Sequence, residues 1–269
     1  MKKRLDMILV ERGLVKSREL AKAFVMEGKV LVDGRQVTKA GVLVADNSEI
    51  TLSEAGIPFV GRGGLKLEAA LDFFRLDAAD KVVIDVGCST GGFTDCLIQR
   101  GARKVYCVDV GYGQLAWSLR NDPRVVVMER TNMRYLDREI FGEKDSERKK
   151  SERFEGDEFN DLRNHALDLA AVDVSFISLT KVIPSVLAFL KEDGEIIALV
   201  KPQFEVGKGE VGKGGIVKDE SRRLEAVNSV REDLERHGLV AVGSFVSPVS
   251  GQKGNIEYFL YMKRSSHGK

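Results

Sequence analysis

The stretch Val82-Val83-Ile84-Asp85-Val86-Gly87-Cys88-Ser89-Thr90-Gly91-Gly92-Phe93-Thr94-Asp95 decides the fold. A β-branched run surrounds an acidic residue, small residues follow, and an amphipathic segment continues to Gly101. This order of strand, tight turn and helix opens nucleotide-type α/β domains. The sequence therefore predicts a mostly parallel sheet with its ligand site at the carboxyl ends of the strands.

The glycine spacing narrows the choice of ligand. It is Asp-x-Gly-x-x-x-Gly, which differs from the dinucleotide fingerprint Gly-x-Gly-x-x-Gly and from the P-loop. A dinucleotide brings a pyrophosphate to the helix N-terminus, whereas S-adenosylmethionine (SAM) brings a methionine moiety that a glycine backbone can approach closely. We expect a SAM site here. The alternative is a turn that only packs a helix on a sheet.

Composition bounds the class of protein. The 269 residues carry 42 Lys and Arg against 41 Asp and Glu, which excludes a uniformly basic coat but not a local basic patch. No apolar run approaches the roughly 18–20 residues that span a bilayer, and no signal peptide is visible. Cys88, Cys96 and Cys107 lack a metal-type spacing, so we interpret them as reduced thiols of a cytoplasmic protein without a metal site.

Residues 1–52 predict a compact unit. One helix is expected at Leu5, and a second runs from a Ser17 N-cap to Gly28. A hairpin with a type I′ turn at Asp33-Gly34 follows, with further strands at 42–44 and 49–52. The second helix is expected to bury Leu20, Ala23 and Phe24.

Cations gather around the start of that second helix. They are Lys16, Arg18 and Lys22, and cations at a helix N-terminus suit phosphate. On charge alone, a solvated helix face is the alternative. The order of motifs, Arg4-Leu5-Asp6, then residues 12–18, then 28–34, resembles the S4 RNA-binding domain across the whole unit. The resemblance implies docking on structured RNA, with these RNA-binding candidates: Arg4, Lys16, Arg18, Lys22 and, beyond the linker, Arg62.

The rest of the chain predicts one larger domain. Residues 53–60 are expected to be a linker, 61–263 an α/β domain and 264–269 a tail. The predicted strands are 82–86, 104–110, 125–129, 167–173, 195–200, 239–246 and 256–262. One predicted helix starts near residue 65, and others span 93–101, 179–190 and 222–237. Residues 111–115 lead into a further helix that ends at Arg120, and Gly194 is expected to mark a turn. Residues 138–165 hold 16 charges in 28 residues, nine acidic and seven basic, and are interpreted as a mobile surface insertion.

Several polar residues fall at predicted strand ends. Asp109, 24 residues after Asp85, is placed where nucleotide-type folds grip a ribose, with a capping aspartate as the alternative. Asn132, after the third strand, is expected near the adenine edge. Lys66 is expected in the first turn of its helix, where a cation opposes the helix dipole, which points to another role. The segment from Gly207 to Lys213 is rejected as a P-loop because Gly214 replaces the required Ser or Thr.

Asp173 and Lys201 end successive strands, so we expect them side by side. A ribose hydroxyl is a poor nucleophile and must lose its proton to accept a methyl group. A lysine is a base for this step only when burial or a second cation favours its neutral form, and carboxylates would position it. Lys66 and Glu257 could join from either end of the domain. The alternative for each residue is a surface salt bridge.

Six motifs in combination resemble the TlyA (hemolysin A-like) family of S4-plus-FtsJ-type ribosomal RNA methyltransferases. The motifs lie at residues 62–67, 85–95, 109–115, 173–178, 201–205 and 254–259. The resemblance implies a Rossmann-like SAM-dependent methyltransferase domain, doubly wound around a mostly parallel sheet, with a small N-terminal α+β S4 domain. It also implies 2′-O-methylation of cytidine in ribosomal RNA, with ribosomal subunits as partners.

The resemblance also assigns residues. Its catalytic tetrad falls on Lys66, Asp173, Lys201 and Glu257, with Lys201 as the leading candidate for the base. Its SAM site falls on the following set: Asp85, Gly87, Ser89, Gly91, Phe93, Asp109 and Asn132. The charged insertion departs from the family pattern and puts substrate breadth in doubt. The alternatives are an assembly factor that binds SAM and RNA without turnover, and a cytolysin, which lacks a suitable membrane-inserting segment.

Overall fold

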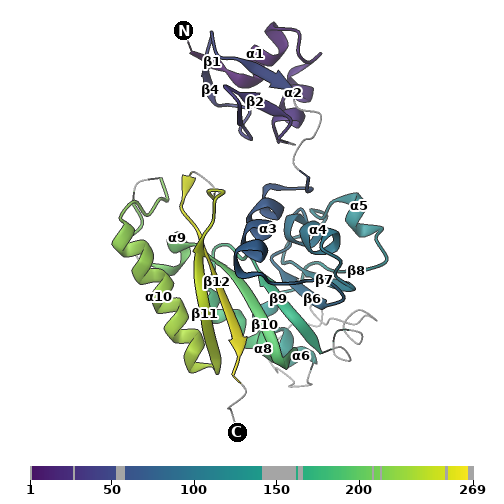
Figure 1. Ribbon diagram of the computed structural model, residues 1–269, viewed down its shortest axis with the longest axis vertical. Coiled ribbons are helices and arrows are strands. Elements are labelled where there is room, and N and C mark those ends of the chain that lie inside the picture. Colours follow the sequence, from purple (N-terminus) through teal and green to yellow (C-terminus); the bar gives the residue numbers. More distant parts are fainter. Residues whose placement is uncertain are drawn as a thin grey trace. The chain divides into compact units, whose positions relative to one another are not determined.

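The computed structural model describes residues 2–26, 28–52, 58–140, 162, 166–207, 209–212, 214–251 and 254–265. The chain divides into two compact units, Met1–Leu65 and Lys66–Lys269. The division falls inside helix α3 (Arg62–Phe74) (Figure 1). Most of the predicted charged insertion, and the tail after Ser265, lie outside the described residues, although helix α6 (Met133–Ile140) includes the first residues of the insertion.

The N-terminal unit combines two helices with short strands. The helices are α1 (Leu5–Glu11) and α2 (Arg18–Met26). The strands are β1 (Lys2–Arg4), β2 (Val30–Val32), β3 (Arg35–Gln36), β4 (Leu43–Ala45) and β5 (Ile50–Leu52). They form a sheet of order β3-β2-β5 and a separate antiparallel pair, β1-β4. The prediction did not include β1.

Local signals place most of this unit correctly. Ser17 Oγ accepts a hydrogen bond from the Leu20 N–H, which confirms the N-cap of α2. Asp33 and Gly34 both have positive φ, as the type I′ turn requires. The predicted apolar face of α2 is wrong in part, because Ala21 and Val25 are the buried residues and Leu20 is 39% exposed. A helix of nine residues allows two neighbouring stripes, and packing on α1 selects one of them.

The second unit is built on one seven-stranded sheet. Its strands are β6 (Val82–Val86), β7 (Lys104–Val108), β8 (Val125–Met128), β9 (Leu167–Val172), β10 (Leu190–Val200), β11 (Leu239–Val246) and β12 (Tyr258–Arg264). Their order is β11-β12-β10-β9-β6-β7-β8; β12 runs antiparallel to both of its neighbours, β11 and β10, and the other neighbouring strands are parallel. This confirms the mostly parallel α/β fold closed by a final antiparallel pair.

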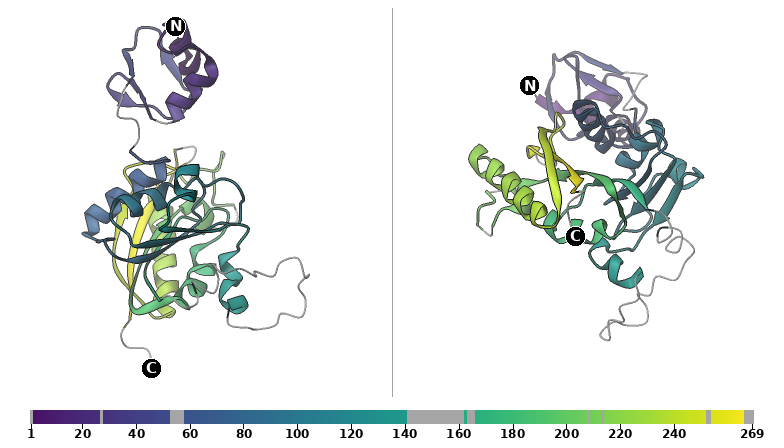
Figure 2. Two further views of the ribbon diagram at one scale, coloured as in Figure 1. Left: turned by 90° about the vertical axis from the view of Figure 1, so that its right-hand side faces the viewer. Right: turned by 60° about the horizontal axis from the view of Figure 1, so that its bottom comes forward.

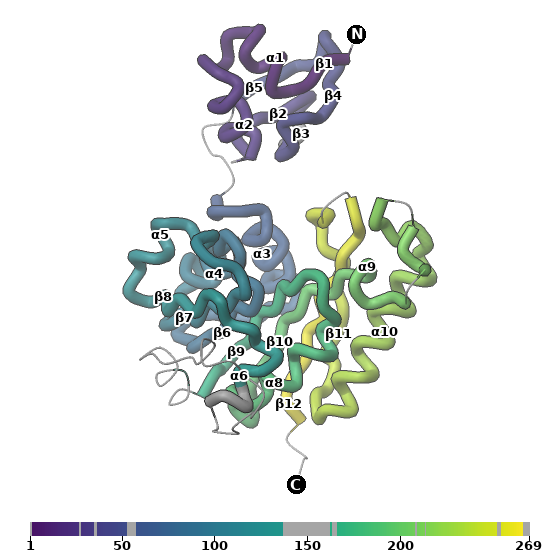
Figure 3. Tube along the Cα trace, turned by 180° about the vertical axis from the view of Figure 1, so that it is seen from behind, coloured from purple at the N-terminus to yellow at the C-terminus, as the bar shows by residue number. Residues whose placement is uncertain are grey.

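Helices cover both faces of this sheet. On one face α3 and α4 (Gly92–Gln99) pack through aromatic contacts, such as Phe93 on Phe259 and Phe74 on Tyr261 (Figure 1). On the other face lie α6, α8 (Ile183–Leu187) and α10 (Glu220–Arg236) (Figures 2 and 3). Three short helices belong to the connections that follow strands in the chain: α5 (Trp117–Arg120) after β7, η2 (Leu179–Lys181) after β9 and α9 (Pro202–Glu205) after β10. Because the central strands are buried on both faces, their sequences are nearly continuous apolar runs, and these runs are the pattern from which the strands were predicted.

Three predictions for this unit are wrong. Helix α3 begins at Arg62, so Lys66 lies beyond its first turn and the dipole argument for Lys66 does not hold. The predicted helix over 179–190 is instead η2 followed by α8, and Leu190 already belongs to β10. Gly194 marks no turn. It lies in β10, where the pairing with β9 shifts register between Leu190 and Glu195. The pattern of apolar and polar residues around Gly194 could not distinguish a turn from a register shift within a strand.

Candidate active site

Sheet topology brings the predicted tetrad to one edge. Strand β9 lies between β6 and β10, so the carboxyl ends of all three meet there. Strand β12 is antiparallel, and its first residue, Tyr258, is opposite Val200, the last residue of β10. Asp173 after β9, Lys201 after β10 and Glu257 before β12 therefore gather at this edge. Lys66 reaches the same group from α3.

Lys201 is held by two groups of the loop after β9. Its Nζ lies 2.5 Å from Asp173 Oδ1 and donates a hydrogen bond to Ser175 Oγ at 2.9 Å. The side chains of Lys201 and Asp173 are only 10% and 22% exposed. These two contacts, both from one loop, fix the direction of the Lys201 amine. Both side chains of the ion pair are largely shielded from water.

Lys66 and Glu257 form a second, more deeply buried pair. Lys66 Nζ donates to Glu257 Oε2 at 2.6 Å. A Cβ atom at Gly251 would lie 1.8 Å from Glu257 Oε1, so only glycine leaves room for this carboxylate. Because both side chains are buried, the surface salt bridge considered from sequence is wrong for this pair.

Asp85, on β6, is a buried carboxylate without a cation. Its Oδ2 accepts a hydrogen bond from Thr94 Oγ1 at 2.6 Å, and its Oδ1 has no hydrogen-bond partner within the described residues. Burial raises the pKa of Asp85 to about 7; the Thr94 hydrogen bond opposes the rise and nearby Asp173 adds to it. A ligand that brings a cationic amine would supply the missing donor, as the methionine end of SAM does.

The turn after β6 requires glycine because it passes close to the backbone of the loop after β9. Gly87 has φ +86°, and a Cβ there would meet the Asp173 carbonyl oxygen at 2.5 Å. Gly91, at the N-cap of α4, and Ser89 also have positive φ. Asp109 joins this turn to the next loop, because its Oδ2 accepts from the Ser89 N–H at 2.8 Å and its Oδ1 from the Gly111 N–H at 2.6 Å.

Three of the predicted SAM residues have contacts of their own. Asp109 uses one acceptor position on each oxygen, so the carboxylate retains capacity for ribose hydroxyls. The Phe93 ring is buried against Phe259, which leaves only its backbone N–H at the start of α4 to face a ligand. Asn132 Oδ1 accepts from the Arg134 N–H at 3.2 Å and thereby caps α6.

In the N-terminal unit, two predicted RNA-binding arginines share a buried carboxylate. Asp6 is fully buried, with Arg4 Nε 3.0 Å from its Oδ1 and Arg18 Nη2 3.0 Å from its Oδ2. The hydrogen bond from Arg4 lowers the pKa of Asp6 to about 2 against the effect of burial, and Arg18 contributes further. The arginine side chains remain about half exposed, whereas Lys16 and Lys22 are exposed on the surface.

Sequence reasoning missed how Glu205 fastens the loop after β9. Its Oε2 accepts from Ser178 Oγ at 2.6 Å and its Oε1 from the Leu179 N–H at 3.0 Å. Burial raises the pKa of Glu205. The loop also holds Phe176 at φ +66°, an uncommon conformation for a bulky residue, with its ring 89% exposed and 5.0 Å from the Phe204 ring. The only sequence signal was the position of both residues inside the quoted motifs.

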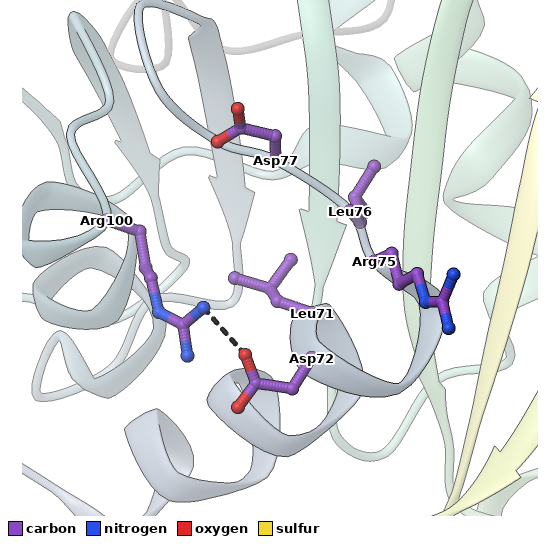
Figure 4. A pocket seen from close by; sticks show the side chains of 6 residues that line it. All are labelled: Leu71, Asp72, Arg75, Leu76, Asp77 and Arg100. Atoms are coloured by element: carbon purple, nitrogen blue, oxygen red, sulfur yellow. Dashed lines mark ion pairs between the residues drawn. The ribbon is translucent and has the colours of Figure 1, made fainter.

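A separate pocket lies away from this edge. It is lined by Leu71, Asp72, Arg75, Leu76, Asp77 and Arg100, with an ion pair of 2.7 Å between Arg100 and Asp72 (Figure 4). The chain runs from there into the start of β6, so the pocket is at the opposite edge of the sheet from the tetrad. None of the predicted site residues lines it.

The described helices include none with the length and apolarity needed to cross a membrane. Among the described residues, no three His, Cys, Asp or Glu side chains form a group that could hold a metal ion. The unpartnered Asp85 oxygen would fit the amino group of SAM, and the remaining acceptor positions of Asp109 would fit its ribose hydroxyls.

Comparison with known proteins agrees with this architecture. Residues 59–264 match the FtsJ-like methyltransferase family and residues 3–50 the S4 domain. The class is therefore an FtsJ-like methyltransferase with an N-terminal S4 domain.

Full-length relatives identify the family. The 16S/23S rRNA (cytidine-2′-O)-methyltransferase TlyA of Mycobacterium tuberculosis is 43% identical, covering 97% of this chain and 89% of the relative. Hemolysin A of Brachyspira hyodysenteriae is 36% identical, covering 96% and 98%. The solved structure of a hemolysin-like protein from Streptococcus thermophilus has 38% identity and a TM-score of 0.70, covering 98% and 89%. The chain belongs to the TlyA family.

Proposed function

We propose that this protein transfers a methyl group from SAM to the ribose 2′-oxygen of cytidine in ribosomal RNA. The observation that carries the proposal is the convergence of two buried lysine–carboxylate pairs beside a glycine-shaped turn. The TlyA relative in M. tuberculosis, which covers almost the whole chain, carries this activity in its name. The S4 match supports RNA as the substrate class.

The SAM site is proposed at the turn after β6. Asp85 would accept from the amino group, Asp109 from the ribose, and the backbone of Gly87, Ser89 and Gly91 would line the ligand. Phe93 would contribute its N–H, and Asn132 the adenine end. When bound, SAM supplies a methyl group on a sulfonium centre that is already a good leaving group, so alignment of the acceptor provides much of the rate.

The tetrad is proposed to prepare the acceptor. Lys201 takes the proton of the 2′-hydroxyl as that oxygen accepts the methyl group and the bond between the methyl carbon and the sulfonium sulfur breaks. Asp173 and Ser175 hold the amine in place, since both contact its Nζ. Lys66, fixed by Glu257, stabilises the negative charge that develops on the oxygen. Phe176, exposed at the rim of the site, offers a face on which the target base can stack.

The remaining assignments describe how RNA arrives. We propose residues 1–52 as the RNA-binding domain, 53–60 as a linker, 61–263 as the catalytic domain and 264–269 as a tail. Lys16, Lys22 and the anchored pair of Arg4 and Arg18 would contact phosphates, joined by Arg62 at the start of α3. Ribosomal subunits in the cytoplasm are the proposed partners.

The test is transfer of labelled methyl from SAM to ribosomal subunits that lack the modification. The expected product is a cytidine whose 3′ linkage resists alkali, because a 2′-O-methyl group removes the attacking hydroxyl. Mapping alkali-resistant positions with and without the protein identifies the nucleotide and the subunit. SAM binding without any transfer would assign the chain to the non-catalytic alternative, and a base-methylated product would contradict the ribose assignment.

A further inference from the structure

The loop after β7 and the first residue of α5 expose three large apolar side chains. Val110 is 71% exposed, Tyr112 68% and Trp117 78%. They follow the carboxyl end of β7, at the same edge of the sheet as the SAM turn and the tetrad. Trp117 is the only tryptophan in the chain. Large apolar side chains grouped on eight residues beside a proposed active site call for a binding partner.

An arginine completes this surface. The Arg130 guanidinium carbon lies 4.2 Å from the centroid of the Tyr112 ring. Arg130 is exposed, and no described carboxylate forms an ion pair with it. Its neighbour Glu129 is already used, since that carboxylate pairs with Arg120 and accepts from the Gly113 N–H. The guanidinium therefore retains its charge and donors for a partner.

The segment is fastened to the sheet rather than loosely attached. The Arg130 N–H donates to the Gly111 carbonyl at 3.0 Å, and the Ala116 N–H donates to the Thr90 carbonyl at 3.1 Å. Glu129 bonds Gly113 at 2.9 Å and also pairs with Arg120. Rigid aromatic side chains lose little conformational entropy when they bind, which suits a preformed contact surface.

We propose that Val110, Tyr112, Trp117 and Arg130 bind an unpaired RNA segment next to the target nucleotide. This rests on the proposed function and adds a second RNA contact, on the catalytic unit itself. Aromatic faces stack on any base, and an arginine lying over a ring contacts phosphate at the same time. A protein partner would match the apolar area but would leave the Arg130 charge unused. RNA uses both.

The test uses Trp117 as its own reporter in the full-length protein. A 12-nucleotide single-stranded RNA of mixed sequence, added at saturating SAM, is expected to quench Trp117 fluorescence. The titration should move to higher RNA concentration with added salt. The variants Tyr112→Ala and Arg130→Gln should each weaken this binding about 10-fold, because stacking contributes about 1–3 kcal/mol per base. Tyr112→Phe, which keeps the ring, should restore it.

The same variants are then assayed for methyl transfer to ribosomal subunits. The KM for subunits is expected to rise about 10-fold, with kcat and SAM affinity unchanged. The matched control is Phe73→Ala with Arg75→Gln. These exposed residues lie at the end of α3, at the opposite edge of the sheet, and should leave both readouts unchanged.

Each other outcome overturns the inference. Full quenching by SAM alone would assign the surface to the cofactor site. A Trp117 signal that depends on protein concentration without RNA would assign it to contact between two copies. Unchanged KM and quenching in the variants, while the unmodified protein methylates subunits, would refute the inference and leave the proposed function standing. If the unmodified protein transfers no methyl group but RNA quenches Trp117, the proposed function fails and the RNA surface remains.

Discussion

Among the described residues, each unit buries one aspartate completely, and the two are used in opposite ways. Asp6 in the N-terminal unit is held by Arg4 and Arg18, and its pKa falls to about 2. Asp85 in the catalytic unit has a hydroxyl partner but no cation, and burial raises its pKa to about 7. A buried carboxylate paired with cations of the same protein holds the fold together, and we call it an anchor. A buried carboxylate that lacks a cation is prepared for a ligand that brings one.

The tetrad lies between these two cases, because each of its carboxylates is paired with a lysine that we assign to the chemistry. Lys201→Ala would leave Asp173 without its cation, like Asp85, and would also remove the proposed base. We expect a loss of about 10²–10⁴-fold in kcat with SAM affinity retained, since this is the usual contribution of a general base. Labelled methyl transfer and equilibrium SAM binding measure the two terms. Normal turnover in both Lys201→Ala and Asp173→Ala, with SAM bound, would contradict the tetrad assignment.

Asp6→Asn tests the anchor. The substitution keeps the shape but leaves two arginines facing a neutral amide, and it is expected to destabilise the N-terminal unit by about 2 kcal/mol. This is below the roughly 3–5 kcal/mol for breaking a fully buried pair, because both arginines are half exposed and screened by water. Chemical denaturation followed by a probe in residues 1–52 measures the change. Glu11→Gln, at the exposed pair with Lys3, is the matched control and should change stability little.

Asp85→Asn tests the prepared site. It removes the negative charge and one of the two acceptor oxygens that a ligand amine would contact, but no protein cation, so stability should stay the same or increase. SAM affinity should fall about 10-fold, which corresponds to about 1.4 kcal/mol and to one charge-assisted hydrogen bond. Calorimetric titration with SAM and thermal unfolding of the same sample separate the two effects. A large loss of stability with unchanged SAM affinity would show that Asp85 is an anchor after all.

The two aspartates predict opposite dependences on pH. Asp6 has a folded-state pKa below the unfolded value of about 4, so its contribution is present above pH 4 and is lost as the pH falls towards 2. Asp85 has a folded-state pKa above the unfolded value, so the native state binds the extra proton and stability falls as the pH rises from about 4 to about 7.

Unfolding free energies of the single variants isolate these slopes, and Asp85→Asn should abolish the second one. SAM binding should tighten by up to about 10-fold between pH 6 and pH 8, as Asp85 ionises, and this dependence should also vanish in Asp85→Asn. A SAM affinity that is independent of pH in the unmodified protein would argue against contact with the Asp85 carboxylate.

Much of the architecture could be predicted from local patterns. The apolar strand from Val82, the cap at Ser17 and the turn at Asp33-Gly34 depend on neighbours in the chain, and the structure confirms each of them. The glycine pattern after β6 likewise predicted a close ligand approach, because positive φ is a local property that glycine satisfies. Errors arose where two local solutions were similar, as on the faces of α2 and at Gly194.

The candidates for the chemistry were evident from the amino-acid sequence alone: the lysines and carboxylates of the motifs, the glycine turn and the basic N-terminal unit. Which residues pair with which depends on the folded arrangement. Lys66 and Glu257 are 191 residues apart, and their pairing depends on β12 running antiparallel beside β10. Asp6 has arginine partners, whereas Asp85 has no cation beside it. The difference depends on which distant side chains packing brings within hydrogen-bonding distance. The pairing of a buried aspartate is therefore a property of the folded structure and not of the local sequence.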